Sequence, residues 1–189
     1  MGWIIGIGIG VIFVALIVIA IVLVISTYNK LVVLRNKARN SWAQVDAQLQ
    51  RRFDLIPNLV ETVKGFAAHE KQLLENVTAS RGGYLNAQTN QEKIAMNEQL
   101  TTHLRSLYVV TENYPQLKAD VNFLKLQASL AEIEEDIVYA RQFYNDAVTI
   151  YNNKLMTFPN NIIAGMFSFK EEVLFNAVQE AKVAPKVQF

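Results

Sequence analysis

The sequence predicts an all-α fold, in which an N-terminal transmembrane helix is followed by an antiparallel bundle of long helices of the four-helix type. Residues 3–25 form an apolar run longer than the roughly 20 residues that a helix needs to cross a bilayer. Beyond it, apolar residues recur at spacings of three and four, as on one face of a helix. No segment shows the alternation of a β-strand.

Composition limits both the domain organisation and the chemistry. The chain has 189 residues, a formal charge of +1, 51% hydrophobic residues and no cysteine. We expect an anchor in residues 1–29 and one helical domain in residues 30–189. The lack of cysteine excludes disulfides, thiolate-bound zinc, iron–sulfur clusters and cysteine nucleophiles. The near-neutral charge argues against nucleic acid as the main partner.

The apolar run reads as a permanent anchor in the cell membrane. It is too long for the core of a signal peptide, it lacks a basic segment before it, and residues 26–28 offer no small-x-small cleavage pattern. The bases Lys30, Arg35, Lys37 and Arg39 follow it, with no acid before Asp46. The positive-inside rule therefore predicts a single-pass protein with a short external N-terminus and a cytoplasmic C-terminal domain.

Three glycines within the first residues suggest a helix-association face. Gly2, Gly6 and Gly10 are four apart and form two overlapping small-xxx-small motifs, through which membrane helices approach closely. Glycine is also common in membrane helices in general, and Gly8 lies off this face. The pattern therefore indicates either a homo-oligomer in the bilayer or only the usual glycine content of a membrane helix.

The spacing predicts a long amphipathic helix over residues 30–81. Pro57 removes one amide, but the apolar pattern continues past it, so we expect a kink rather than an end. Residues 81–83, Arg-Gly-Gly, are expected to end the helix. Its apolar positions are Leu31, Leu34, Ala38, Trp42, Val45, Leu49, Phe53, Ile56, Val60, Val63, Ala67, Leu74 and Val77.

Three further helices are predicted. Thr89 and Glu92 match a capping box and begin a helix over residues 89–113. A long helix follows over residues 116–157, up to Phe158-Pro159. Residues 162–169 are an apolar patch without clear periodicity, which packs in the core or touches lipid. A short helix is expected over residues 170–181 and an extended tail over residues 185–189.

The residues that carry chemistry are few. The chain has two histidines, and neither His69 nor His103 completes an H-E-x-x-H or E-x-x-H metal motif. No G-x-S-x-G, P-loop or G-x-G-x-x-G motif occurs. We therefore assign no catalytic residue, no metal ligand and no cofactor site, and we expect a protein that is not an enzyme.

Polar residues are dense beside the predicted kink. Arg51, Arg52, Asp54, Asn58 and Glu61 crowd positions close to the core, and the last three are four and three residues apart on one helix face. One interpretation is a notch that binds a partner. The other is a satisfied polar cluster that fixes helix register, with the arginines exposed.

The charged segments and a recurring dipeptide can each be interpreted in a general or in a more specific way. Residues 132–136 hold four acids, whereas residues 30–52 are rich in bases, so the two segments are either complementary or simply solvated. The dipeptide Tyr-Asn occurs at residues 28, 144 and 151. Without a fixed period, it does not indicate a structural repeat.

Together these stretches resemble the LemA family over essentially the whole chain. The most specific stretch is the Asp-Leu-Ile-Pro-Asn-Leu-Val sequence of residues 54–60, within the similar residues 48–65. The other matching positions are Tyr28-Asn29, Arg35, Trp42, His69-Glu70, residues 112–115, residues 140–145, Tyr151-Asn152, Phe158-Pro159 and residues 185–189.

The resemblance implies a bacterial membrane protein with one N-terminal span and a cytoplasmic helical bundle. It supplies no reaction, and it links the family with membrane proteases and envelope stress only by association. Two functions follow as hypotheses. The first is a non-enzymatic, self-associating scaffold at the membrane, and the second is an adaptor that binds a membrane protease or another membrane protein.

Overall fold

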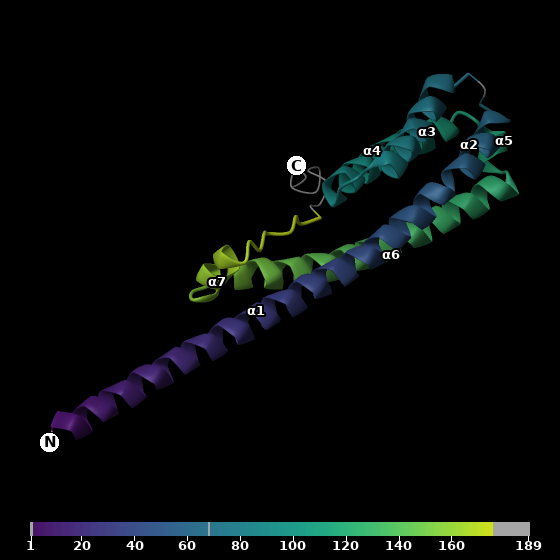
Figure 1. Cartoon of the computed structure of the whole chain (residues 1–189). Helices are drawn as coiled ribbons and strands as arrows, with labels where there is room; N and C mark the ends of the chain where they lie inside the picture. Colours follow the sequence, from purple (N-terminus) through teal and green to yellow (C-terminus); the bar gives the residue numbers. More distant parts are fainter. Residues whose placement is uncertain (1, 68, 176–189) are drawn as a thin grey trace, which may run out of the picture. The chain divides into compact units, whose positions relative to one another are not determined.

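A computed structural model of the chain describes residues 2–67 and 69–175 (Figure 1). Every regular element in these ranges is an α-helix, which confirms the all-α class for the described part of the chain. The helices are α1 (Gly2–Asp54), α2 (Ile56–Lys64), α3 (Lys71–Asn86), α4 (Asn90–Thr111), α5 (Pro115–Lys118), α6 (Val121–Met156) and α7 (Asn160–Met166).

The chain divides into two compact units. Among the described residues, the first unit contains residues 2–40 and 146–172, and the second contains residues 41–67, 69–145 and 173–175. Both α1 and α6 contribute residues to each unit. We therefore describe the two units one at a time.

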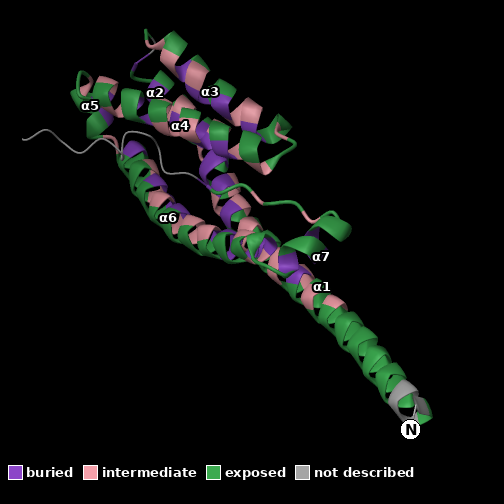
Figure 2. Ribbon diagram, turned by 90° about the vertical axis from the view of Figure 1, so that its left-hand side faces the viewer, coloured by how far each residue is buried: buried purple, intermediate pink, exposed green. Residues whose placement is uncertain are grey.

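The N-terminal part of α1 is uncovered in the first unit. The described residues contain one helix that is long and apolar enough to cross a membrane, and none of its apolar window is buried by the rest of the protein. Figure 2 shows this part of α1 as exposed. The helix continues without a break through residues 26–40, which agrees with the absence of a helix breaker there.

The core of the first unit forms where α1, α6 and α7 meet. Its buried members are Leu31, Tyr151, Leu155 and Ala164, with Leu34 and Phe169 packed against them. The apolar patch at residues 162–169, expected to lack periodicity, contains the helix α7. The opposite faces of α7 differ, because Ile163 and Ala164 are buried whereas Ile162 and Met166 are exposed.

In the second unit the helix predicted over residues 30–81 is interrupted twice. The first break is at Leu55, between α1 and α2, where Pro57 lies in the first turn of α2 and its missing N–H is not needed. The apolar face continues past this break, as predicted. The pattern assigned Val60 to the core, but Val60 is half-buried and its neighbour Leu59 is buried instead. The second break lies between Lys64 and Lys71, so a single helix to residue 81 was wrong.

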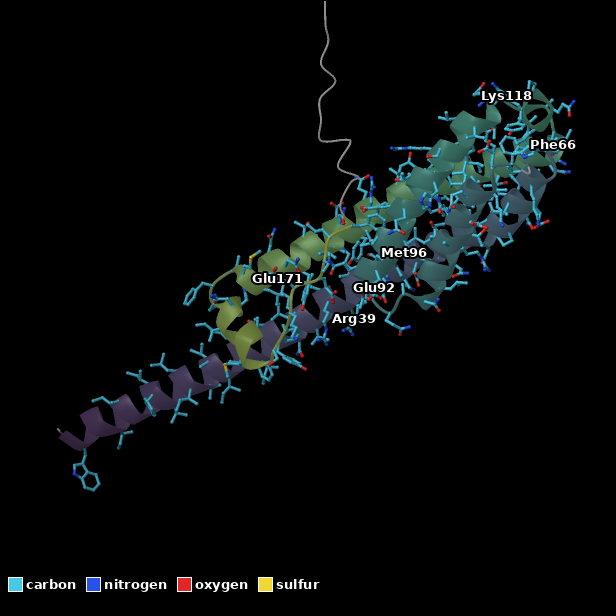
Figure 3. All side chains as sticks on the ribbon, turned by 90° about the horizontal axis from the view of Figure 1, so that it is seen from above. Arg39, Phe66, Glu92, Met96, Lys118 and Glu171 are labelled. Carbon is cyan, nitrogen blue, oxygen red and sulfur yellow. The ribbon has the colours of Figure 1, made fainter. Side chains whose placement is uncertain are left out.

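The two glycines expected to end a helix do not end it. α3 continues through Gly82 and Gly83 to Asn86, and neither glycine has a positive φ. A Cβ atom at Gly83 would collide with the sulfur of Met96 on α4, whereas one at Gly82 would meet nothing within 4 Å. Gly83 therefore allows α3 and α4 to approach closely, and Figure 3 shows Met96 and Glu92 on α4.

The start of α4 agrees with the prediction. The Thr89 hydroxyl accepts the Glu92 N–H at 3.2 Å, and the Glu92 carboxylate accepts the Thr89 N–H at 3.1 Å. The same carboxylate oxygen accepts the Gln88 N–H at 2.6 Å. These backbone hydrogen bonds favour the charged form and lower the pKa of Glu92.

The helix predicted over residues 116–157 consists of two helices. α5 ends at Lys118 and α6 begins at Val121. Asp120 causes the new start, because its Oδ1 accepts the N–H groups of Asn122 and Phe123 at 2.9 Å each. α6 then ends at Met156, close to the Phe158-Pro159 boundary that the sequence predicts.

The short helix expected over residues 170–181 is not found in its described part. Residues 170–175 have no helical structure and are held by side chains of α6. Residues 176–181, and the tail at residues 185–189 that we expected to be extended, lie outside the described residues.

A pair of glycine substitutions tests the packing of α3 on α4. Gly82→Ala should raise the free energy of unfolding by about 0.5–1 kcal/mol, because alanine restricts the unfolded chain and fits the helix. Gly83→Ala should gain less or lose stability, because its methyl group must displace Met96. Urea unfolding of the full chain in detergent, followed by circular dichroism, measures both changes. Equal gains would contradict the close approach, and the difference should vanish in a Met96→Ala background.

Candidate functional site

The predicted polar cluster divides into a buried part and an exposed part. Arg51 and Arg52 follow one another near the end of α1 and face different surroundings. Arg51 is exposed, and its Nη1 lies 2.8 Å from Gln48 Oε1 and 3.2 Å from Asp136 Oδ2. This contact is a surface ion pair, which contributes little to stability.

Arg52 is the centre of a buried polar network that joins three helices of the second unit. The residue is 4% exposed. Its Nη1 donates to Asn97 Oδ1 at 2.7 Å and to Thr101 Oγ1 at 3.0 Å, both on α4. Its Nη2 lies 3.0 Å from Glu134 Oε2 on α6. The interpretation that both arginines are exposed was wrong for Arg52, because this side chain is buried and has partners on two other helices.

Burial and charge act in opposite directions on Arg52. Desolvation lowers its pKa, and the charge of Glu134 raises it. A guanidinium remains protonated at neutral pH, so the network holds a buried cation. The pairs Arg52–Glu134 and Arg51–Asp136 also show that the acidic segment at residues 132–136 contacts the basic segment at residues 30–52. The two segments are therefore complementary, which was one of the two interpretations of their charges.

A cavity of about 300 Å³ adjoins this network in the second unit. Arg52 and Glu134 supply polar groups to its wall, and Leu104 and Leu130 supply apolar surface. Tyr108 also lines it, and burial raises the pKa of the phenol, so the hydroxyl is neutral at physiological pH. The cavity thus combines an apolar wall with the Arg52–Glu134 ion pair and a further cationic side chain, Arg105.

Asp54, Asn58 and Glu61 form the exposed part of the cluster. Asp54 accepts a hydrogen bond from Gln50 Nε2 at 2.8 Å, and Glu61 lies 3.7 Å from Lys64 Nζ. Asn58 and Glu61 line an open groove of about 450 Å³ between α2 and α6, together with Asn122, Lys125 and Ser129. The structure therefore brings Asn58 and Glu61 to one surface and places Arg52 elsewhere.

Asp46 is a central residue that the sequence analysis missed. Its Oδ1 accepts the hydroxyl of Tyr84 on α3 at 2.7 Å, and both its carboxylate oxygens lie 2.8 Å from Lys93 Nζ on α4. Tyr84 also stacks on Phe53, with ring centroids 4.2 Å apart. Burial, followed by the hydrogen bond to Asp46, raises the pKa of Tyr84. The only signal in the sequence was that Asp46 is the first acid after a series of bases.

Two Tyr-Asn dipeptides of α6 bind the backbone of the segment that follows α7. In the first unit, Asn152 Nδ2 donates to the Glu172 carbonyl at 2.9 Å, and the Glu172 N–H donates to Asn152 Oδ1 at 3.0 Å. The Tyr151 hydroxyl donates to the Lys170 carbonyl at 3.0 Å. One asparagine thus satisfies both backbone groups of one residue, as a neighbouring strand would.

The second unit repeats the arrangement. Asn145 Nδ2 donates to the Phe175 carbonyl at 2.9 Å, and the Phe175 N–H donates to Asn145 Oδ1 at 2.8 Å. The Tyr144 hydroxyl donates to the Val173 carbonyl at 2.6 Å. Two of the three Tyr-Asn dipeptides therefore share one structural role, which the sequence did not indicate, although the dipeptides still have no fixed period. We call these two pairs the Tyr-Asn clips.

The glycines of the predicted self-association face are only partly described. Gly2 and Gly6 lie within α1, but their surroundings are outside the described residues. A Cβ atom at Gly10 would meet nothing within 4 Å, and the same holds for Gly8. The space beside Gly10 is thus open to a second helix.

The described residues bring few reactive groups together. In residues 2–67 and 69–175, no three His, Asp or Glu side chains gather as a metal site requires. Ser80 Oγ lies 2.9 Å from His103 Nδ1, but Ser80 is 2% exposed, and its hydroxyl donates to the Asn76 carbonyl. This pair fixes the packing of α3 on α4 and is closed to a substrate.

The regular structure of the described residues is helical, and its one uncovered apolar helix fits a membrane-associated helical protein. The model of the LemA family matches residues 41–189. Because this match covers most of the chain, the protein belongs to the LemA family.

The relatives found by sequence similarity agree with this assignment. Protein LemA of Metamycoplasma hominis is 23% identical over 156 residues, which cover 82% of this chain and 71% of the relative. Magnetosome protein MamQ 2 of Paramagnetospirillum magneticum is 25% identical over 174 residues, covering 78% of this chain and 64% of the relative. Magnetosome protein MamQ of Magnetospirillum gryphiswaldense is 22% identical, with 79% and 64% covered. The chain thus spans less than two thirds of the MamQ proteins.

Neighbouring arginines provide a matched test of the buried network. Arg52→Ala should lower the free energy of unfolding by about 2–3 kcal/mol, because it leaves the buried Asn97 amide without its charged donor, while water can hydrate the half-exposed Glu134. Arg51→Ala should cost about 1 kcal/mol or less, because its ion pair is exposed. Urea unfolding of the full chain in detergent measures both. Similar losses for the two variants would show that the network contributes no more than a surface pair.

Neighbouring asparagines test a Tyr-Asn clip. Asn152→Ala should speed hydrogen exchange at the Glu172 amide, because this N–H loses its acceptor. Asn153→Ala is the control, since Asn153 lies beside Asn152 on α6 with its side chain exposed. Hydrogen–deuterium exchange resolved by NMR or mass spectrometry reads the amide. Unchanged protection in Asn152→Ala would mean that the segment is held by other contacts.

Proposed function

We propose that this protein is a non-enzymatic scaffold that is anchored in the cytoplasmic membrane and self-associates there. The observation that carries the proposal is α1, a helix of 53 residues whose apolar first part is uncovered and whose last part belongs to a packed helical unit. Water is a poor solvent for such a surface, and a bilayer is a good one. The names of the LemA and MamQ relatives do not indicate an enzyme, which is consistent with the proposal.

The orientation is part of the proposal. Lys30, Arg35, Lys37 and Arg39 follow the apolar run on α1, and the next acid is Asp46. By the positive-inside rule this end of the span lies in the cytoplasm. The helical body is then cytoplasmic, and the N-terminus is outside.

We also propose that the body is an antiparallel four-helix bundle. Within the second unit, Trp42 and Arg51 of α1 contact Tyr144 and Asp136 of α6, respectively, so the two helices run in opposite directions. Ser80 of α3 contacts His103 of α4, and Gly83 faces Met96, which gives the same relation for this pair. Arg52 links α1 to both α4 and α6, as a core residue of a bundle would.

Self-association is proposed to occur through the glycine face of the span. Gly2, Gly6 and Gly10 stack along one side of α1, and the space around Gly10 is open. In lipid, helices associate through close packing of small residues rather than through the hydrophobic effect. Two copies of α1 could therefore meet along this face.

Light scattering of the protein in detergent tests the scaffold. The full chain should form a discrete oligomer, and a shortened chain that begins at Thr27 should be smaller, because it lacks the association face. Gly6→Leu combined with Gly10→Leu should reduce the full chain to monomers. Gly8→Leu is the control, because Gly8 lies off the face and its Cβ position is equally open.

The second candidate function is an adaptor for a membrane protease or another membrane protein. The exposed groove with Asn58 and Glu61 favours it, since these polar groups have room for a partner. Arg52 is excluded from such a surface by its burial. Monomers from both chains in light scattering, together with stoichiometric co-purification of a protease that Asn58→Ala abolishes, would favour the adaptor over the scaffold.

A further inference from the structure

After its first two residues, Asn160 and Asn161, the helix α7 of the first unit is apolar on both faces, although only one face is covered. Ile163 and Ala164 are buried in the unit. The opposite face exposes Ile162 and Met166, and exposed phenylalanines at positions 158 and 167 flank the helix. Phe158 is 79% exposed and Met166 is 68% exposed. A helix that is hydrophobic all round is expected to be buried or to contact lipid.

The position of α7 relative to the apolar run of α1 indicates what covers this face. The Phe167 ring lies 4.8 Å from the ring of Tyr28, and the Phe169 ring lies 5.6 Å from it. Tyr28 follows the last apolar residue of the run, Ile25, by three residues, a rise of about 4.5 Å along a helix. The exposed face of α7 is therefore held at the end of the candidate span.

The burial of α1 places part of this contact inside the apolar run. Val24 and Thr27 are half-buried, whereas the described residues of α1 before Val24 are exposed. Val24 belongs to the apolar run and lies on the same helix face as Thr27, Tyr28 and the buried Leu31. The rest of the first unit thus covers α1 as far as Val24, at the end of the candidate span.

Bases outnumber acids in the first unit. Residues 26–40 carry Lys30, Arg35, Lys37 and Arg39 and no acid. Residues 146–172 add Lys154 and Lys170, together with the acids Asp146, Glu171 and Glu172. The Arg35 guanidinium lies 5.0 Å from the centre of the Phe169 ring. Exposed aromatic and aliphatic side chains beside such a group of cations are typical of a surface that binds anionic lipid.

We propose that α7, with Phe158 and Phe167, lies in the interface of the same bilayer that α1 crosses, and that its exposed apolar face enters the acyl boundary while the neighbouring cations bind anionic headgroups. This inference rests on the proposed function, because it takes α1 to be the span. It makes the first unit a two-point membrane attachment, with one helix through the bilayer and one on its surface.

Single cysteines provide the test, because the chain has none of its own. Ile162→Cys and Met166→Cys carry an environment-sensitive fluorophore on the exposed face of α7, and Ile12→Cys carries it in the span. Val109→Cys is the reference for water, since Val109 is an exposed apolar residue on α4 of the second unit. The full chain is reconstituted into phosphatidylcholine vesicles with and without phosphatidylglycerol, and each label is quenched by spin-labelled lipid or by iodide.

With phosphatidylglycerol present, the labels at positions 162 and 166 should be quenched by the lipid and lose quenching by iodide, whereas the label at position 109 should behave in the opposite way. Without phosphatidylglycerol, the lipid quenching at positions 162 and 166 should fall. Lipid access at position 12 with water access at position 166 would overturn the placement of α7 and leave the anchor intact. Water access at position 12 would overturn the anchor and this inference together. Equal lipid quenching at position 166 in both vesicles would overturn the role of anionic headgroups.

Discussion

The uncovered apolar surface of the first part of α1 is the constraint to which the rest of the chain is adapted. Aliphatic side chains contribute about 0.3–0.6 kcal/mol each to insertion at the centre of a bilayer, and residues 3–25 are almost all of this kind. The same side chains would promote aggregation in water. We expect three features of a chain that leaves a membrane after residue 25. These are the continuous helix that follows, its basic residues and the apolar surface of α7.

Polar side chains occupy positions between the packed helices of the second unit, where apolar side chains are more usual. Arg52 is buried and meets partners on α4 and α6, and Asp46 holds Tyr84 of α3 and Lys93 of α4. A buried ion pair is weak evidence for stability, because desolvation offsets much of its attraction. Its effect on geometry is more definite. A helix that slipped by one residue would leave a charge buried without a partner, so these contacts select one register.

The sequence predicted the features that depend on local pattern. The Thr89–Glu92 capping box involves residues three apart, and the apolar spacing identified core residues from Leu31 to Val77. Features that depend on distant residues were missed. The burial of Arg52 requires Asn97 and Glu134, and the role of Gly83 requires Met96 on another helix. The cap at Asp120 was hidden because the apolar spacing continues through it. The exposed groove at Asn58 and Glu61 depends on α6, which no pattern near Pro57 could reveal.

The Tyr-Asn clips have a consequence for how freely this sequence can change. Each clip hydrogen-bonds to carbonyl and N–H groups of residues 170–175, which every amino acid except proline provides in the same form. The clips therefore do not select side chains at residues 170–174, and most replacements there should be tolerated as long as proline is avoided at position 172, whereas the buried side chain of Phe175 is constrained by packing. The constraint falls instead on Asn145 and Asn152, whose amides supply a donor and an acceptor together. The sequence of residues 170–174 can therefore vary more freely than the two asparagines of α6 that bind its backbone.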